Sequence, residues 1–206
     1  MSRRIAPSEL DYSNMLPLGI TGSSRMRMFN PDNGNTFDAT NRTINVPLNS
    51  TGFLDAAHSY LNFTVALAGT GVMGLDGGAQ ALIQTLRIIG SNGEVLEEIQ
   101  NYNTVQAAFS DLQCSSDHTD SHLNAMERHT TTPGQPEVAA ARSLDVSLKL
   151  MSGLLSSGKY VPLGFLSGGG LSIEITLATN ADALTQTAPN VDATFTLTNC
   201  RYAAQI

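Results

Sequence analysis

The chain has 206 residues, which suits one large all-β domain better than two small ones, and its hydrophobic content of 41% is enough to form a core. Charged residues make up only 14% of the chain, against roughly 25% in typical soluble domains, so much of the surface is expected to be neutral or covered by partners. The net charge of −7 argues against binding to nucleic acid through phosphate contacts, and no apolar run approaches the roughly 20 residues of a membrane-spanning helix.

The first part of the chain, residues 1–41, is predicted to be an extended N-terminal arm. Proline and glycine interrupt every run in it, and the stretch FNPDNGN is dense in turn-forming residues. Apolar residues such as Leu16, Leu18 and Ile20 indicate that the arm lies against another surface, because a freely solvated tail would be more polar. The domain itself is expected to span residues 42–206.

From Arg42 onward the hydrophobic period is two, which predicts strands with one buried and one polar face. Clean alternation of this kind is typical of antiparallel sheets that pack on one side. The expected strands number eight and lie within residues 42–48, 60–67, 81–90, 93–99, 143–150, 159–165, 171–178 and 193–206.

One segment has helical spacing instead. In NTVQAAFSDLQ the apolar residues Val105, Ala108, Phe109 and Leu112 recur at helical intervals behind a candidate cap at Asn103, which predicts one short helix. A long polar segment follows before the next strand. Loops of that length are often found at interfaces.

The fold class expected from these elements is all-β: an eight-stranded antiparallel jelly-roll sandwich with an extended N-terminal arm and one short helix. An immunoglobulin-like sandwich is less consistent with the sequence, because its cysteine and tryptophan landmarks are missing and the chain has no tryptophan. The two cysteines, Cys114 and Cys200, lie far apart in the sequence and are expected to be free thiols in a reducing compartment. The N-terminus lacks a signal peptide, so we expect synthesis inside the cell without secretion.

The glycines Gly69, Gly71 and Gly74 have the GxGxxG spacing of a dinucleotide-binding loop. The strand before them alternates apolar with polar residues, however, and the following Leu75-Asp76-Gly77-Gly78 would break a helix in its first turn. We therefore interpret this stretch as a loop between antiparallel strands.

The polar segment that follows the predicted helix contains the residues best suited to bind a metal ion. His118, His122 and His129, with neighbouring acidic residues, have ligand-like chemistry and could hold a divalent ion on a helix, but the segment is rich in Ser and Thr and its helical character is weak. The adjacent carboxylates Glu97 and Glu98 are predicted to point to opposite faces of a strand and so cannot act on one bond. We assign no catalytic residue, no cofactor-binding residue and no metal ligand, and we expect a protein that is not an enzyme.

Several stretches resemble the jelly-roll major capsid proteins of tailless icosahedral DNA viruses, in particular the N-terminal jelly roll of the double jelly-roll proteins of polinton-like viruses, virophages and nucleocytoplasmic large DNA viruses. The stretches that carry the resemblance are STGFLDAAHSYLNFTVAL (residues 50–67), LIQTLRIIGSNGEVLEEIQNYN (82–103), LLSSGKYVPLGFLSGGGLSIEITLA (154–178) and ATFTLTNCRYAAQI (193–206).

The resemblance implies a shell subunit that forms homo-oligomers, expected to be trimeric capsomers, and that contacts neighbouring capsomers and minor capsid or penton proteins. It implies a place in the virion, assembled inside the host cell, and it transfers no catalytic residue. A double jelly-roll protein needs a second barrel, so the sequence is either the first half of a longer product or a single jelly-roll subunit; these alternatives stay open.

Two other functions compete with the structural one. A lectin-like binding module would use the loops at residues 69–78 and 114–136, but these lack the aromatic platforms of sugar sites. A metal-dependent β-sandwich enzyme would use His118, His122 and His129.

Overall fold

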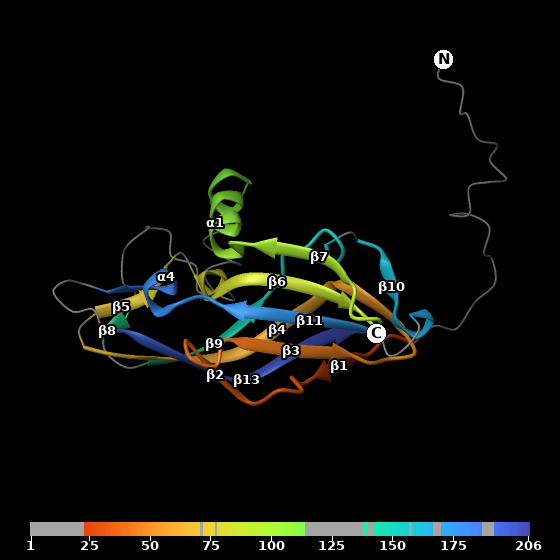
Figure 1. Cartoon of the computed structure of the whole chain (residues 1–206), viewed down its shortest axis with the longest axis horizontal. Helices are drawn as coiled ribbons and strands as arrows, with labels where there is room; N and C mark the ends of the chain where they lie inside the picture. Colours follow the sequence, from red (N-terminus) through yellow and green to blue (C-terminus); the bar gives the residue numbers. More distant parts are fainter. Residues whose placement is uncertain are drawn as a thin grey trace, which may run out of the picture.

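The computed structural model describes residues 23–70, 72–76, 78–113, 138–139, 142–156, 158–166, 170–186 and 192–206. Within them, two antiparallel sheets face each other as a sandwich (Figure 1). The six-stranded sheet has the order β1-β13-β4-β10, with β2 also paired to β13 and β9 to β4. Its strands are β1 (Met26–Phe29), β2 (Thr36–Asp38), β4 (Phe53–Ala68), β9 (Arg142–Leu148), β10 (Tyr160–Pro162) and β13 (Thr194–Gln205).

The four-stranded sheet has the order β3-β11-β6-β7. Its strands are β3 (Thr43–Leu48), β6 (Ile83–Gly90), β7 (Val95–Gln100) and β11 (Leu171–Leu177). A small third sheet, in the order β12-β5-β8, lies at one end of the molecule and is built from β5 (Val72–Leu75), β8 (Val138–Ala139) and β12 (Leu184–Gln186). The remaining elements are α1 (Tyr102–Gln113), α4 (Asn180–Ala183) and 3₁₀ turns at Ala79–Leu82 and Leu163–Phe165.

The path of the chain defines a jelly roll. Taken in sequence order, the strands β1, β3, β4, β6, β7, β9, β11 and β13 pass from one large sheet to the other at every step except the hairpin between β6 and β7. Their spatial orders, β1-β13-β4-β9 and β3-β11-β6-β7, place the first strand beside the last, as two interlocked Greek keys require. The predicted fold class is confirmed.

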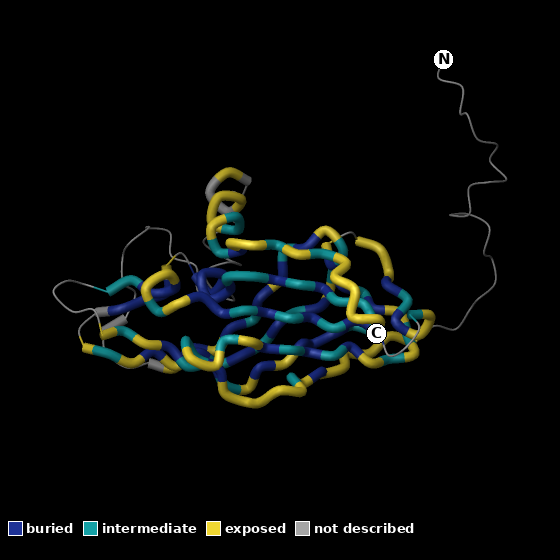
Figure 2. The backbone as a smooth tube through the Cα atoms, viewed as in Figure 1, coloured by how far each residue is buried: buried dark blue, intermediate teal, exposed yellow. Residues whose placement is uncertain are grey.

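The predicted period of two explains how the sandwich fills its interior. In β3 the inward residues Ile44, Val46 and Leu48 are at most 1% exposed, while the residues between them face outward. Strand β11 shows the same alternation over its seven residues. Figure 2 shows the buried residues concentrated between the two sheets. Register is therefore fixed strongly, because a shift of one residue would expose the apolar face of either strand.

The predicted arm and the predicted strand at 159–165 differ from the structure. Residues 26–29 and 36–38, predicted to belong to an irregular arm, form β1 and β2, and both pair with β13. Conversely, the stretch at 159–165 forms only the three-residue β10 and a 3₁₀ turn. The first strand of the jelly roll thus lies inside the expected arm; residues 1–22 lie outside the described part of the chain.

The predicted helix is present as α1, which begins at Tyr102, one residue before the cap expected at Asn103. The Tyr102 ring is fully buried and its hydroxyl accepts a hydrogen bond of 2.8 Å from the backbone N–H of Met151, so the base of the helix is tied to the core. Phe109 and Leu112, by contrast, are 43% and 84% exposed. Within the described residues no helix is long and apolar enough to cross a membrane.

Candidate assembly surfaces

The candidate metal-ligating residues of the sequence fall outside the part of the chain that the structure describes. His118, His122 and His129, with Cys114, lie outside the described residues. The described part of the chain contains no group of three His, Cys, Asp or Glu residues placed to hold a metal ion. His58 on β4 forms a 2.8 Å contact between its Nδ1 and Oδ2 of Asp55, on the surface.

The glycine-rich stretch follows β4, as predicted, but leads into a strand. Gly69 has a φ of 150° in the turn after β4, and Gly74 lies within β5, which pairs with β12. A side chain at Gly69 would come within 3.0 Å of the Ala193 backbone, so this glycine permits a close approach of two chain segments. Gly69 and Gly74, the two of these glycines that the structure describes, lead into a strand and not into a helix, which does not match a dinucleotide-binding loop.

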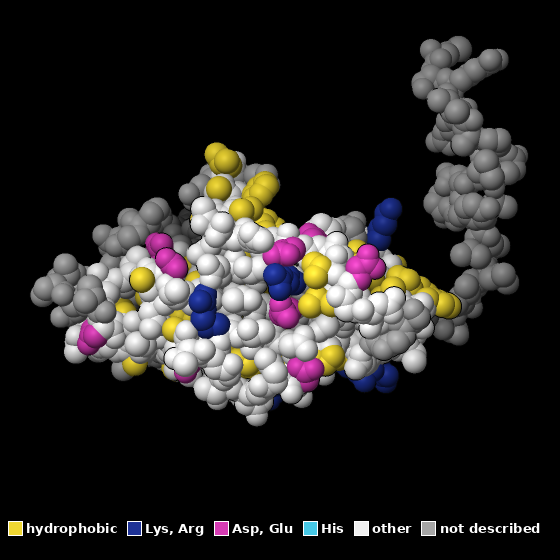
Figure 3. All heavy atoms as spheres, in the orientation of Figure 1, with side chains coloured by type: hydrophobic (Ala, Val, Ile, Leu, Met, Phe, Trp, Pro, Cys, Tyr) yellow, Lys and Arg dark blue, Asp and Glu magenta, His cyan; other side chains and the backbone are white. Residues whose placement is uncertain are grey.

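The outer face of the four-stranded sheet carries an ion-pair triad. The guanidinium of Arg87 on β6 lies 3.2 Å from Glu98 of β7 and 3.2 Å from Glu174 of β11. Hydrogen bonds to Gln100 and Arg87 lower the pKa of Glu98, and the hydrogen bond and charge of Glu98 raise that of Arg87. Most of the surface that Figure 3 shows is uncharged, as the composition predicts.

The outer face of the six-stranded sheet is lined by small neutral side chains near its centre. On β13, Thr196 lies opposite Ala66 of β4, and Thr198 lies opposite Thr64. Thr64 donates a 2.8 Å hydrogen bond to Asp145 of β9. These central side chains are uncharged and would lose little hydration energy when covered, although Asp145 and Asp38, which lies opposite Thr196 on β2, border them.

Exposed aromatic side chains gather at one end of the molecule, opposite the third sheet. Phe53, Tyr160 and Phe165 are 53%, 69% and 81% exposed, and the rings of Phe53 and Phe165 meet edge to face with centroids 6.1 Å apart. Tyr160 belongs to β10, whose Pro162 pairs with Phe53 at the start of β4. We call Phe53, Tyr160 and Phe165 the apolar end; Figure 3 shows hydrophobic side chains gathered where β10 lies in Figure 1.

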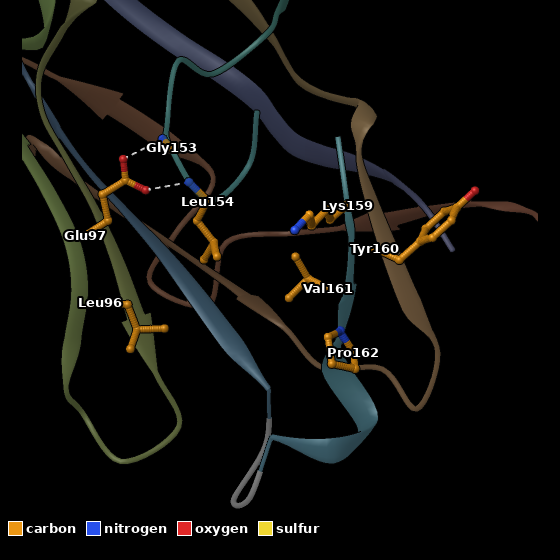
Figure 4. A pocket seen from close by; sticks show the side chains of 8 residues that line it. All are labelled: Leu96, Glu97, Gly153, Leu154, Lys159, Tyr160, Val161 and Pro162. Atoms are coloured by element: carbon orange, nitrogen blue, oxygen red, sulfur yellow. Dashed lines mark hydrogen bonds between the residues drawn. The ribbon is translucent and has the colours of Figure 1, made fainter. Parts of the chain in front are cut away.

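Two hollows flank the apolar end. One, of about 450 Å³, lies between the turn at Asn49–Thr51 and the 3₁₀ turn after β10, and Arg27 of β1 forms part of its wall. The other, of about 540 Å³, lies between Leu96 on β7 and the residues of β10 (Figure 4). The second hollow therefore opens along the edges of both large sheets.

Glu97 fixes the loop that borders this second hollow. Its carboxylate accepts hydrogen bonds from the Ser152 hydroxyl at 2.6 Å and from the backbone N–H groups of Gly153 at 2.6 Å and Leu154 at 3.0 Å. Burial alone would raise the pKa of Glu97, but the three hydrogen bonds outweigh it and lower that pKa. Glu98 points instead to the outer face, so the prediction that the two carboxylates diverge is confirmed.

The opposite end is held together by polar contacts between loops. Asp192 accepts hydrogen bonds from the Thr70 hydroxyl at 2.9 Å and from the Gln186 amide at 2.7 Å, and these interactions lower its pKa. Gln186 in turn accepts a 2.9 Å bond from the N–H of Ala193. The turn after β4 and the turn before β13 are thus joined.

The sequence did not reveal the apolar end. Phe53 precedes the predicted strand at 60–67, whereas Tyr160 and Phe165 both belong to the predicted strand at 159–165, much further along the chain. The sequence held a signal for two of them: Phe53 stands outside the predicted strand at 60–67, and Tyr160 is out of phase with Val161 and Leu163. Phe165 continues the alternation of that strand, so nothing in the local pattern marked it as exposed. A cluster of exposed aromatic side chains is typical of a surface that binds another protein segment or ligand.

Among the comparisons with known proteins, only the comparison with solved structures found matches, and it supports the fold. No protein-family model matches the sequence, and no curated protein is similar to it in sequence. Solved structures of viral proteins do match, which places the chain in the class of jelly-roll folds that viral major capsid proteins adopt.

The individual likenesses cover most of this chain. The Faustovirus major capsid protein matches with a TM-score of 0.54 and 9% identity over 97% of this chain and 57% of that one. PBCV-1 VP54, in a crystal structure fitted into a cryo-EM reconstruction of the virophage Sputnik, matches with a TM-score of 0.51 and 14% identity over 88% and 41%. The mavirus major capsid protein aligns over 100% and 51% at 11% identity and a TM-score of 0.45. The chain spans about half the length of these structures.

Proposed function

We propose that the chain is a structural subunit of a viral capsid, which assembles into capsomers of an icosahedral shell and resides in the virion. The observation that carries the proposal is the jelly-roll topology together with its likeness to the Faustovirus major capsid protein over 97% of the chain. The role is structural rather than enzymatic, with other copies of the chain as its principal partners. A trimeric capsomer, joined to minor capsid or penton proteins, is the form we infer.

The length of the chain bears on how it takes part in the shell. It spans about half of the structures it matches, which is consistent with one barrel of a two-barrel subunit. A single barrel that assembles alone is the other form of the same proposal. The reading frame beyond Ile206 distinguishes them, because a second set of strands with a period of two would identify the two-barrel form.

The outer face of the six-stranded sheet is the surface through which we expect neighbouring copies to make contact in the shell. Thr64, Ala66, Thr196 and Thr198 form a neutral area in its centre, where a neighbour can pack with little desolvation. The lectin-like alternative gains no support from the described residues, since Phe53, Tyr160 and Phe165 lie at the end opposite to β5, which follows Gly69. Its second loop, at residues 114–136, lies outside the described residues.

Size-exclusion chromatography with light scattering, followed by negative-stain electron microscopy, tests the proposal on the full chain. We expect trimers or larger closed assemblies, and strictly monomeric behaviour at high concentration would contradict it. Thr196→Glu should weaken assembly by adding a second carboxylate beside Asp38 in this area, while Thr85→Glu, on the outer face of the other sheet, serves as the matched control. If the two variants weakened assembly equally, the outer face of the six-stranded sheet would not be the surface that contacts neighbouring copies.

A further inference from the structure

The apolar end exposes more aromatic surface than an isolated domain normally leaves in water. Phe165 is 81% exposed, although its ring already meets that of Phe53, and Tyr160 is 69% exposed on the neighbouring strand. The hollow of about 450 Å³ beside them is walled by Leu163 and Leu166. A contiguous surface of this kind marks the docking site of another segment.

The described part of the chain begins beside this surface. The N–H of Arg25 donates to the carbonyl of Ile206 at 2.7 Å, and the N–H of Ile206 donates to the carbonyl of Arg25 at 2.9 Å. Ile206 lies against Gly52, the residue before Phe53, so closely that a side chain at Gly52 would collide with it. Arg27, two residues after Arg25, lines the hollow, and a nitrogen of its guanidinium lies 3.5 Å from the Ser50 hydroxyl oxygen. The 22 residues before Ser23 therefore join the sandwich at its apolar end.

The sequence of that segment matches an extended occupant. In MLPLGI (residues 15–20), Leu16, Leu18 and Ile20 alternate with Pro17 and Gly19. Proline and glycine disfavour a helix, and in an extended chain a period of two places the three apolar residues on one face. At about 3.3 Å per extended residue, these three positions lie within roughly 10 to 25 Å of Ser23 along the chain.

We propose that residues 1–22 fold back over the apolar end of their own chain, with Leu16, Leu18 and Ile20 against Phe53 and Phe165 and in the adjoining hollow. The short tether favours the same chain over a neighbour, because it gives the segment a high effective concentration at the site. The segment then acts as an intramolecular cover that shields the exposed rings. This inference goes beyond the proposed function and does not depend on assembly.

Photo-cross-linking of the full chain at a concentration where it is monomeric tests this cover. The photoreactive residue p-benzoylphenylalanine replaces Phe165 in one variant and, as the control, Leu112 on α1, which is 84% exposed. A mixture of ¹⁴N-labelled and ¹⁵N-labelled protein is irradiated and the linked peptides are identified by mass spectrometry. The expected main product joins position 165 to residues 15–20 within one isotopic label, and the control position gives no such product.

A second set of variants tests whether the cross-link depends on Leu16, Leu18 and Ile20 or only on the segment being tethered nearby. Replacing Leu16, Leu18 and Ile20 together by serine should remove the product, whereas Ile5→Ser should leave it; all variants should keep the cooperative thermal unfolding of the parent. The proposal is overturned if the product joins chains of different label, which would identify a second copy as the occupant. It is equally overturned if position 165 links to no residue of the segment, or does so only when phosphatidylserine vesicles are present.

Discussion

At the scale of single residues, Glu97 joins the edge of one sheet to a loop of the other half of the sandwich. Its carboxylate receives three hydrogen bonds from residues 152–154 while it lies on the edge strand β7. Tyr102, only a few positions further along the chain, holds Met151 of the same loop. Two neighbouring positions therefore fix the wall of the hollow beside β10.

Glu97→Gln should lower the free energy of unfolding by about 1 kcal/mol at neutral pH, because the amide replaces an ionised acceptor and turns an N–H group toward backbone donors. The loss should shrink in acid. Since folding lowers the pKa of Glu97, its contribution is complete above the ordinary carboxyl pKa and disappears as the pH falls through the lowered value, below about pH 4.5. Urea titrations between pH 7 and pH 3 measure this, with Glu94→Gln in the exposed β6–β7 turn as control; a difference independent of pH would contradict it.

Cys200 is a second residue whose surroundings determine its chemistry. Its side chain is 4% exposed on β13, and burial raises the pKa of the thiol to about 12. Because the thiolate is the reactive form, iodoacetamide at pH 8 should leave Cys200 unmodified in the native protein and label it in denaturant. Peptide mapping by mass spectrometry reports the two states, and rapid native labelling at this position would show that β13 opens locally.

At the scale of elements, alternation explains both what could be predicted and how the sheets are stabilised. Strands β3 and β11 follow directly from their apolar positions, and their pairing places Ile175 opposite Ile44 in the core. Ile175→Ala should cost about 2–5 kcal/mol by leaving a cavity, whereas Thr176→Ala on the outer face should cost about 1 kcal/mol or less. Thermal or chemical unfolding of the two variants checks this, and equal losses would mean that the assigned register is wrong.

Strand β1 could not be predicted from hydrophobic alternation. It has four residues, MRMF, of which only Phe29 is buried, so no alternation is long enough to detect. Its identity as a strand comes from pairing with residues 202–205 at the other end of the chain. Helix α1 illustrates the opposite case: its spacing predicted the helix correctly, but periodicity alone cannot determine whether Phe109 and Leu112 find a neighbour within the same chain.

The candidate surfaces were less predictable than the fold for the same physical reason. The low charge of the sheet faces follows from composition, and the divergence of Glu97 and Glu98 follows from strand geometry. The apolar end depends on β10 pairing with the first residues of β4, a contact between distant segments that no local pattern encodes. Local periodicity thus determines which residues are buried, and topology determines which exposed residues meet.

At the scale of the whole molecule, the jelly roll closes only because its first and last strands pair. The β13 strand lies between β4 on one side and β1 with β2 on the other, so removing residues 23–41 would leave a long strand with an unpaired edge. Unpaired strand edges are templates for association with other chains. The domain boundary expected at residue 42 therefore falls inside a unit that the sheet needs.

Two fragments test this boundary. Residues 23–206 retain all described strands and should unfold cooperatively, whereas residues 42–206 lack β1 and β2 and should be less stable and prone to aggregate through β13. Circular dichroism during thermal unfolding and light scattering distinguish them. If the shorter fragment were as stable and as monodisperse as the longer one, β1 and β2 would be dispensable additions to the sheet. The jelly roll would then be closed by other contacts than the pairing of its ends.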